Sequence, residues 1–420
     1  MKLNKSTTIC IIGLGYVGLP LAVSFEKHFD VIGYDIDLKR INNLRKGYDT
    51  TDEVSRNDLL KAKSIKYTSE IDNIKNVDIF IITVPTPIYK NKTPDLRLLK
   101  KSCDTVGKII KKNSIVVFES TVYPGVTEEV CATLIEKKSG LKFNLDFFCG
   151  YSPERIDPGK SKHKLQNIIK ITSGSNQYSS NVIDKLYKKI IKAGTYRADS
   201  IKVAEAAKVI ENTQRDLNIS LVNELSILFN KLDIKTNKVL DAAATKWNFI
   251  NFRPGLVGGH CIGVDPYYLT FKSKKIGYNP KVILSGRKMN DEMSRYVSNK
   301  AISELKKKYK RVHDRKILIL GFSFKENCKD VRNTKVYDLY RYLRQKKINI
   351  DIYDPLVDKK DVDKYYKVKL LKKLPKNKYD LIIIAVGHKE FINIKSKYFI
   401  GSLVFDLKSI KKDLKSDFSF

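Results

Sequence analysis

The apolar residues of this chain form short continuous runs, and these runs alternate with stretches that have helical spacing. Continuous runs of this length are typical of strands buried on both faces, as in a parallel sheet. In the N-terminal part we expect strands at 8–14, 31–34, 78–84, 114–119 and 146–150. Helical patterns lie between them, from about 15 to 28 and at 96–111. This alternation predicts a βαβ sheet domain over residues 1–199.

The pattern changes after residue 199. From 200 to about 232, alanines and leucines recur at helical spacing without glycine or proline, which predicts one long helix. Shorter helical patterns follow around 235–244 and from about 290 to 309. We therefore expect a central helical segment at 200–311 that joins two lobes.

Strand and helix signals begin again in the C-terminal part, which predicts a second sheet domain over residues 312–420. The expected strands are 316–320, 348–353, 380–386 and 402–406, with a helix at 334–346. No GxGxxG follows the first of these strands, so this domain should bind something other than a second dinucleotide. The predicted fold class is α/β, with a Rossmann domain, a helical middle and a Rossmann-like domain.

The composition suits a globular protein of two or three domains, because 42% of the 420 residues are hydrophobic. The formal net charge is +34, but the lysines are scattered over all segments, as on a solvated surface. We find neither an RNA-binding aromatic signature nor zinc-finger spacing, and therefore expect no nucleic-acid partner.

Six cysteines lie far apart without CxxC pairs, which argues against a zinc site and a disulfide framework and favours a reducing cytoplasm. Residues 8–25 are uncharged, but three glycines and Pro20 within them speak against a signal peptide. No other stretch is apolar enough to span a bilayer, so we expect no membrane partner.

A GxGxxG motif directly follows the first predicted strand and opens the first predicted helix, with glycines at Gly13, Gly15 and Gly18. Asp35 ends the next strand, twenty positions beyond Gly15. This is the context that a dinucleotide fingerprint requires, since the helix N-terminus favours the pyrophosphate and the acid accepts hydrogen bonds from the ribose. Asp35 would repel a 2′-phosphate, so we expect NAD rather than NADP; Arg40 weakens this preference, because a guanidinium can pair with phosphate.

Polar and turn-forming residues follow the later strands, where open α/β sheets bind their ligands. Pro85 and Thr86 follow one strand, Thr121 the next, and Glu154 and Arg155 a third. Without the cofactor motif, Thr121 would be interpreted as a helix cap and Glu154 as a loop carboxylate.

Cys261 lies in a glycine-rich loop between two helical patterns, after Gly258 and Gly259 and four residues before Asp265. Glycines let a ligand lie close to the backbone beside the thiol, and Asp265 would reach what the thiol binds. The alternative is a small buried structural cysteine.

On the long helix Lys208, Asn212 and Arg215 fall at i, i+4 and i+7, so they project from one face. That face is either a solvated stripe or the wall of a cleft opposite Cys261, where a lysine stabilises an oxyanion. Lys325 and Arg332, seven residues apart, are candidates for phosphate or cofactor contacts.

Six motifs occur along the chain in this order: GLGYVGLP, ESTVYPG, SPER, AEAAKVIENT, GGHCIGVDP and GFSFKENCKDVR. Together they resemble the UDP-glucose/GDP-mannose dehydrogenase family, and within it the bacterial UDP-N-acetyl-D-glucosamine/galactosamine 6-dehydrogenases of Vi-antigen, capsule and O-antigen type. The resemblance implies an N-terminal NAD domain, a central dimerisation segment, a C-terminal domain for the UDP moiety, and a homodimer. It adds Tyr16 and Val17 to the expected cofactor contacts.

The resemblance also implies a role for each matching residue. Cys261 matches the nucleophile, Lys208 the lysine that stabilises the oxyanion, and Asn212 the amide beside it. Asp265, Thr121 and Glu154 match groups that handle water and protons, Arg332 a cofactor contact, and Arg253 an arginine that enters the neighbouring subunit's site. The expected substrate contacts are Glu154, Arg155, Lys208, Asn212, Arg215, Arg253, Gly258 and Lys325.

Departures from the family pattern concern the sugar. UDP-glucose enzymes have a lysine where this chain has Val264 and a glutamate where it has Pro158, and the segment 47–54 resembles the acetamido-sugar branch. We therefore expect a UDP-N-acetylhexosamine to be oxidised to the uronic acid, through a thiohemiacetal and a thioester on Cys261 and without a metal. UDP-glucose, UDP-N-acetylmannosamine and GDP-mannose are the alternative substrates. A two-electron hydroxyacid dehydrogenase and a basic binding protein with a structural dinucleotide are the rival functions.

Overall fold

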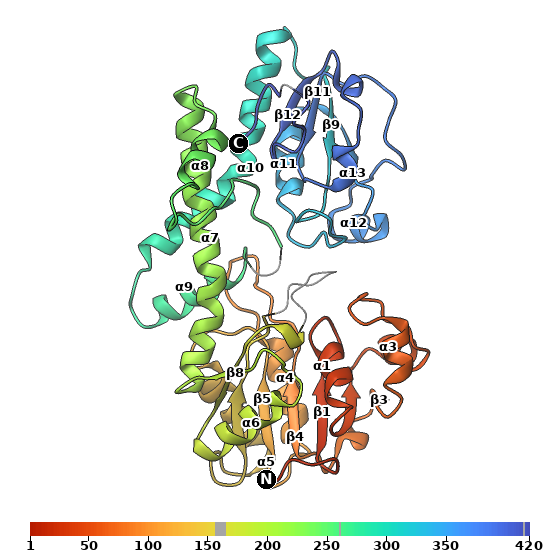
Figure 1. Cartoon of the computed structure of the whole chain (residues 1–420), viewed down its shortest axis with the longest axis vertical. Helices are drawn as coiled ribbons and strands as arrows, with labels where there is room; N and C mark the ends of the chain where they lie inside the picture. Colours follow the sequence, from red (N-terminus) through yellow and green to blue (C-terminus); the bar gives the residue numbers. More distant parts are fainter. Residues whose placement is uncertain (156–164, 260–261, 415) are drawn as a thin grey trace. The chain divides into compact units, whose positions relative to one another are not determined.

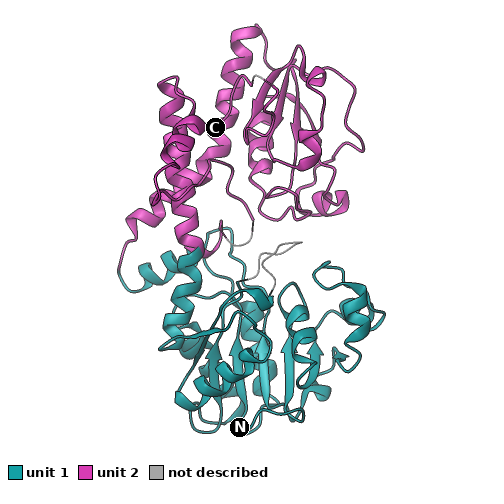
Figure 2. Cartoon of the chain, viewed as in Figure 1, with its two compact units in different colours: residues 1–211, 267–277 teal, residues 212–266, 278–420 magenta. Residues whose placement is uncertain are grey.

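The computed structural model describes residues 1–155, 165–259, 262–414 and 416–420, so Cys261 and Pro158 lie outside the described residues. The chain divides into two compact units (Figure 2). The first comprises Met1–Glu211 and Tyr267–Gly277, and the second Asn212–Pro266 and Tyr278–Phe420. The boundary falls inside helix α7 (Ile201–Lys231), which therefore contributes residues to both units. The predicted division into three domains at 199 and 311 stays a prediction.

The first unit contains a sheet of eight strands in the order β3-β2-β1-β4-β5-β6-β7-β8 (Figure 1). The first six positions of this order are those of dinucleotide-binding folds. Neighbouring strands are parallel except β6 and β7, which are antiparallel. The strands are β1 (Thr8–Ile12), β2 (Asp30–Tyr34), β3 (Lys66–Thr68), β4 (Ile79–Ile82), β5 (Ile115–Phe118), β6 (Phe148–Tyr151), β7 (Lys170–Gly174) and β8 (Thr195–Arg197).

Helices cover this sheet because its central strands are apolar on both faces, with all residues of β4 and β5 buried. Apolar side chains of α1, α2 and α6 form one continuous core with β1, β4 and β5. The helices of this unit are α1 (Gly18–Phe25), α2 (Leu38–Arg45), α3 (Arg56–Lys61), α4 (Arg97–Gly107), α5 (Thr133–Ser139), which continues a π-helical turn at Thr127–Ala132, and α6 (Gln177–Lys188). Most of α9 (Asp265–Lys275) also belongs to it.

The second unit combines helices with a parallel sheet in the order β10-β9-β11-β12 (Figure 1). The strands are β9 (Lys316–Leu320), β10 (Asn349–Tyr353), β11 (Leu381–Ile384) and β12 (Leu403–Asp406). The helices are α8 (Thr236–Ala243), α10 (Lys281–Lys308), α11 (Lys335–Arg344), α12 (Lys359–Tyr366) and α13 (Lys389–Ile392). Single 3₁₀ turns occur in the two units at Ile71–Ile74, Leu165–Asn167 and Ser396–Phe399.

Helix α10 begins nine residues earlier than the sequence pattern predicts, at Lys281 rather than about 290. Gly286 suggests a break in the pattern, but here it is a packing residue inside the helix. A Cβ on Gly286 would lie 2.5 Å from Cδ2 of Leu217 and 2.9 Å from Oγ of Ser220, both on α7. The glycine therefore lets the two long helices pack closely.

The predicted α/β class is confirmed, with the NAD-type sheet, the long helix and the second parallel sheet in the expected places. In the part of the chain that the structure describes, no helix is both long and apolar enough to cross a membrane.

Candidate active site

The three glycines of the first motif lie in the turn between β1 and α1, and each has a different environment. Gly13 has φ of +93°, which side chains other than glycine rarely adopt. A Cβ on Gly15 would meet no heavy atom within 4 Å, whereas one on Gly18 would lie 1.9 Å from the carbonyl oxygen of Gly13. The turn therefore has open space at Gly15 and close packing at Gly18, as a pyrophosphate beside a helix N-terminus requires.

Tyr16 and Val17 fill the rest of this turn. Tyr16 is 37% exposed, and Val17 caps α1 without a side-chain hydrogen bond, so the first backbone N–H groups of the helix have no side-chain acceptor at the cap. Such N–H groups are the donors that bind phosphate oxygens in dinucleotide folds.

Asp35 and Arg40 lie beside the same turn. Oδ2 of Asp35 accepts from the backbone N–H of Leu14 at 2.8 Å, and Oδ1 accepts from that of Asp37 at 2.9 Å. The guanidinium of Arg40 is buried, donates to the carbonyl oxygen of Leu14 at 2.8 Å and pairs with Asp49 at 2.7 Å. Asp49 belongs to the segment 47–54, so Arg40 holds that segment against the turn.

The segments that follow β4 and β5 are joined at the carboxyl edge of the sheet. Oγ1 of Thr86, which follows Pro85, donates to the carbonyl oxygen of Thr121 at 2.7 Å. The hydroxyl of Tyr268 on α9 donates to the carbonyl oxygen of Thr86 at 2.7 Å. The structure thus brings together Thr86 and Thr121, two residues that the sequence pattern places at this edge.

Glu154 and Arg155 follow β6. Oε1 of Glu154 accepts from the backbone N–H of Arg155 at 2.6 Å, and the Arg155 guanidinium pairs with Glu211 of α7 at 2.8 Å. The ammonium of Lys170 lies 3.7 Å from Oε2 of Glu154 and 2.6 Å from Oε2 of Glu119. Burial raises the pKa of the Glu119 carboxyl to about 7, and Lys170 opposes this shift.

Glu205 connects the Thr121 loop to α7. Its buried carboxylate accepts from the backbone N–H groups of Gly125 at 2.5 Å and Thr127 at 2.9 Å. Burial raises the pKa of Glu205 to about 7, against the effect of these hydrogen bonds. Lys208, one turn further along the helix, is itself 8% exposed.

Glu119, Lys170 and Glu205 were not predicted as site residues from the sequence. Glu119 opens the motif ESTVYPG directly after the apolar run 115–118, and Glu205 in AEAAKVIENT lies among alanines. An acid next to apolar residues was the signal that could have found them. Lys170 begins β7, a strand that the pattern of apolar runs did not predict.

Asn212 and Asp265 are in direct contact in the second unit. Nδ2 of Asn212 donates to Oδ2 of Asp265 at 2.6 Å, and the Asp265 residue, the first of α9, is 3% exposed. Of the other residues on the expected helix face, Lys208 is buried and Arg215 exposed, so burial decreases along that face. Val264, which precedes Asp265, is buried as well.

The loop before Cys261 is held from two sides. The side-chain amide of Asn223 on α7 bonds both backbone groups of Gly255, at 2.8 and 3.1 Å. A Cβ on Gly258 would lie 2.6 Å from the carbonyl oxygen of Asn333, and one on Gly259 would lie 2.5 Å from the Phe324 ring. The glycines thus let this loop approach the GFSFKENCKDVR segment closely.

Arg253, in the same loop, is partly exposed and pairs with Asp241 of α8 at 2.7 Å. Its expected position in a neighbouring subunit's site stays a prediction.

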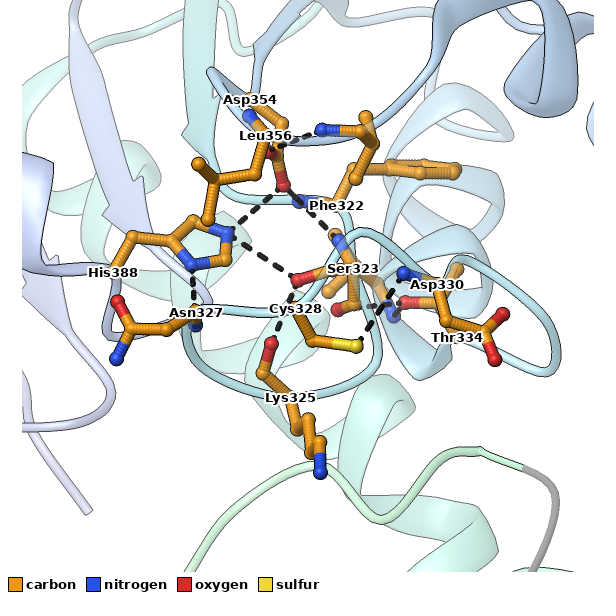
Figure 3. A network of polar contacts seen from close by, with 12 residues as sticks. Phe322, Ser323, Lys325, Asn327, Cys328, Asp330, Thr334, Asp354, Leu356 and His388 are labelled. Atoms are coloured by element: carbon orange, nitrogen blue, oxygen red, sulfur yellow. Dashed lines mark hydrogen bonds and ion pairs between the residues drawn. The ribbon is translucent and has the colours of Figure 1, made fainter. Parts of the chain in front are cut away.

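Lys325 lies in a loop that a buried histidine holds in place (Figure 3). The backbone N–H of Asn327 donates to Nδ1 of His388 at 2.9 Å, so the proton of the neutral ring is on Nε2, 3.0 Å from Oδ2 of Asp354. That carboxylate oxygen also accepts from the backbone N–H of Phe322 at 2.6 Å. The Lys325 side chain extends away from this network (Figure 3).

Arg332, further along the same segment, forms a bidentate pair with Asp330, with Nη2 2.6 Å and Nε 3.0 Å from its two oxygens. This pair fixes the direction of the guanidinium.

Four of the described cysteines, Cys10, Cys103, Cys131 and Cys149, are buried. Burial raises the pKa of the Cys10, Cys131 and Cys149 thiols, which makes them poor nucleophiles.

Comparison with known families matches the chain to three domain models in succession. Residues 7–191 match the NAD binding domain of the UDP-glucose/GDP-mannose dehydrogenase family, residues 202–292 its central domain and residues 318–413 its UDP binding domain. The chain belongs to this family. The resemblance given by the six motifs and the expectation of NAD as cofactor are confirmed.

Among curated relatives within this family, the chain is 53% identical to a UDP-N-acetyl-D-glucosamine 6-dehydrogenase of Salmonella typhi, over 97% of each chain. It is 50% identical to an enzyme of the same name from Pseudomonas aeruginosa, over 98% of this chain and 99% of the relative. Among solved structures, a UDP-D-ManNAc dehydrogenase from Pyrococcus horikoshii superposes with a TM-score of 0.89 at 29% identity, covering 98% of this chain and 97% of the other.

Proposed function

We propose that this protein is an NAD-dependent UDP-N-acetylhexosamine 6-dehydrogenase. It oxidises the C6 hydroxyl of UDP-N-acetylglucosamine or UDP-N-acetylgalactosamine to a carboxylate, in two oxidations of two electrons each. The product is a uronic-acid nucleotide sugar of the kind that enters surface polysaccharides.

The observation that carries the proposal is the 2.6 Å hydrogen bond between Asn212 and Asp265. It sets an amide donor from α7 beside a buried carboxylate four residues after Cys261 in sequence. An amide that stabilises an oxyanion and a carboxylate that handles a proton are the groups that acyl chemistry on a thiol needs.

Cofactor binding is assigned to the glycine turn, where open space at Gly15 would admit the pyrophosphate and Asp35, fixed beside the turn, would accept hydrogen bonds from the ribose. Bound NAD supplies the hydride acceptor for each of the two oxidations. Thr86, Thr121 and Arg332 would add contacts to the cofactor.

Cys261 traps the aldehyde of the first oxidation as a thiohemiacetal. Oxidation of that adduct gives a thioester, which water hydrolyses to the carboxylate and the free thiol. Lys208 and Asn212 stabilise the oxyanions, and an oxyanion donor of this kind contributes about 2.7 to 4 kcal/mol. Thr121, Glu154 and Asp265 position the water and accept its proton.

The sugar is assigned from the relatives and from the residues near the cysteine. Both 6-dehydrogenases above are named for UDP-N-acetyl-D-glucosamine, at 53% and 50% identity. Where UDP-glucose enzymes have a lysine, this chain has a buried valine, Val264. A site that hydrogen-bonds an acetamido group leaves polar partners unpaired when glucose binds, so UDP-glucose is rejected.

The family's homodimer is part of this proposal. On α7, Leu221 and Leu228 are 56% and 47% exposed and fall seven residues apart, on one face of the helix, and Leu232, which directly follows the helix, is 58% exposed. An apolar stripe of this kind suits an interface with a second copy of the chain. We place the reaction in the cytoplasm, in keeping with the free cysteines at Cys10, Cys103, Cys131, Cys149 and Cys328.

Initial rates of NADH formation with UDP-N-acetylglucosamine, UDP-N-acetylgalactosamine and UDP-glucose test the proposal. We expect one or both acetamido sugars to be oxidised with a kcat/KM at least about tenfold above that of UDP-glucose. A higher kcat/KM for UDP-glucose would contradict the substrate, and no NADH with any sugar would favour a binding protein.

A further inference from the structure

Lys170 reaches the carboxyl edge of the first sheet because of the direction of its strand. In the antiparallel pair of β6 and β7, Gly150 lies opposite Gly174 and Tyr151 opposite Ser173. Continued past the end of β6, this register sets Glu154 opposite Lys170. The start of β7 therefore lies at the edge where β5 and β6 end and where ligands of such sheets bind.

The ammonium of Lys170 lies between two carboxylates. Nζ is 2.6 Å from Oε2 of Glu119 and 3.7 Å from Oε2 of Glu154. The hydroxyl of Tyr187 on α6 donates to the other oxygen of Glu119. The side chains of Lys170 and Glu119 are 3% and 0% exposed, while that of Glu154 is 12% exposed.

This arrangement costs stability, because removing an ammonium and a carboxylate from water is expensive even when they pair. Apolar side chains of similar size would fill the same space at lower cost. Packing alone therefore does not explain why Lys170 and Glu119 are buried here. The second carboxylate that Lys170 faces belongs to Glu154, which is a predicted catalytic group.

We propose that Lys170 is a positioning residue for Glu154, fixing the direction of its carboxylate so that it can accept a proton from water. Glu119 and Tyr187 hold Lys170 in place for this purpose. The inference rests on the proposed function, in which Glu154 handles water and protons during hydrolysis of the thioester.

The charges around Lys170 support this role. The titratable groups that face it are Glu119 after β5, Glu154 after β6 and Tyr187 from α6, and Arg155 contributes its backbone N–H to Glu154. Burial raises the pKa of Glu119 to about 7, so this carboxyl gains a proton readily as the pH falls below neutral. The Lys170 charge then acts on Glu154 without competition from an ionised Glu119.

The test is the pH profile of kcat for the full-length enzyme and its Lys170→Met variant. Because the variant removes the positive charge beside this catalytic carboxylate, the acid limb of the kcat profile should move up by about one pH unit, while kcat at high pH stays within about threefold. Lys170→Arg should return the acid limb of the kcat profile most of the way to its wild-type position. The control is Lys188→Met on α6, which removes an ammonium that is 58% exposed and should leave the profile unchanged.

Lys170→Met leaves Glu119 buried without its cation, so a second variant separates catalysis from folding. The double variant Glu119→Gln with Lys170→Met removes one charge of each sign and should still show the upward shift, since Glu154 still lacks its partner. A wild-type profile in the double variant, or an equal loss of kcat at every pH in Lys170→Met, would overturn the inference.

Failure of the inference and failure of the proposed function give different results. If the wild-type enzyme forms two NADH per UDP-sugar and Lys170→Met shows no shift of the acid limb, only the role of Lys170 is wrong. If the wild-type enzyme forms fewer than two, the proposed function fails regardless of the variants.

Discussion

The carboxylate of Asp35 is fixed beside the glycine turn by backbone N–H groups at 2.8 and 2.9 Å, and Arg40 is engaged by Asp49. A 2′-phosphate would meet the Asp35 charge, and Arg40 would have to leave its partner to neutralise it. We predict that kcat/KM for NAD exceeds that for NADP by at least about tenfold, or roughly 1.4 kcal/mol. Equal values for the two dinucleotides would show that Arg40 compensates for the carboxylate.

Two buried acids give the stability of the protein a specific pH dependence. Burial raises the pKa of Glu119 and of Glu205 from 4.5 to about 7. Each carboxyl has a higher pKa in the folded protein than in the unfolded chain. The stability that each carboxyl contributes is therefore fully present below about pH 4.5 and is lost as the pH rises through about 7. These two groups should therefore lower the free energy of unfolding between pH 5 and 7.5.

Denaturant titrations across this pH range check the effect. Glu119→Gln should flatten the pH dependence by on the order of 1–3 kcal/mol, while Glu224→Gln, an exposed residue on α7, should leave it unchanged. The same slope in wild type and Glu119→Gln would mean that Glu119 is ionised in the folded protein throughout this range.

Residue types and spacing predicted which residues lie near one another where the partners are close in sequence or follow neighbouring strands, as Thr86 and Thr121 do. The glycine motif and Asp35 lie within one βαβ unit, so their proximity follows from local structure. The contact of Lys170 with Glu154 depends on an antiparallel strand that the apolar pattern did not reveal. Glu205 and Gly125 are eighty positions apart and become neighbours only when α7 packs on its unit.

His388 is one of the side chains that hold the loop at Phe322–Cys328, together with Asp354. His388→Ala would leave the Asp354 carboxylate and the N–H of Asn327 without the ring, a loss of about 1–3 kcal/mol for buried groups. We predict that the KM for the UDP-sugar rises at least about fivefold, because the loop that carries Lys325 loosens, while the KM for NAD changes less than twofold.

Steady-state kinetics of His388→Ala check this, with His313→Ala as the control. His313 precedes β9 and its side chain is 56% exposed, so its loss should change neither constant. An unchanged KM for the UDP-sugar in a folded His388→Ala variant would show that the loop is held without the histidine.

Helix boundaries were predictable where side-chain composition alone sets them. The long helix was expected at 200 to about 232 and is observed at Ile201–Lys231. The start of α10 was missed because Gly286 weakens the local helical signal, although packing against α7 requires a glycine there. This requirement comes from packing against another helix, so the local sequence around Gly286 cannot predict it.

At the scale of the whole molecule, alternating strand and helix signals were sufficient to predict two sheet domains, since a parallel strand needs a crossover connection. The compact units divide within α7, after Glu211. Composition patterns could not locate this division, because helical periodicity continues through it. The net charge of +34 reflects lysines on many segments and did not predict a partner.

The central claim is that one active site performs both oxidations of the same alcohol carbon. Lys208 and Asn212 are four residues apart on α7, and Asn212 contacts Asp265, so the groups that we propose for aldehyde oxidation and for acyl hydrolysis come from neighbouring segments. A thiol that retains the aldehyde makes two oxidations of one bound molecule possible.

The amount of NADH formed per UDP-N-acetylhexosamine consumed tests this claim most directly. It is measured by absorbance with limiting sugar and excess NAD, together with an aldehyde trap and quantification of the uronic acid. We predict two NADH and one uronic acid per sugar, with no trapped aldehyde. One NADH per sugar, with the aldehyde or another two-electron product in solution, would contradict the account.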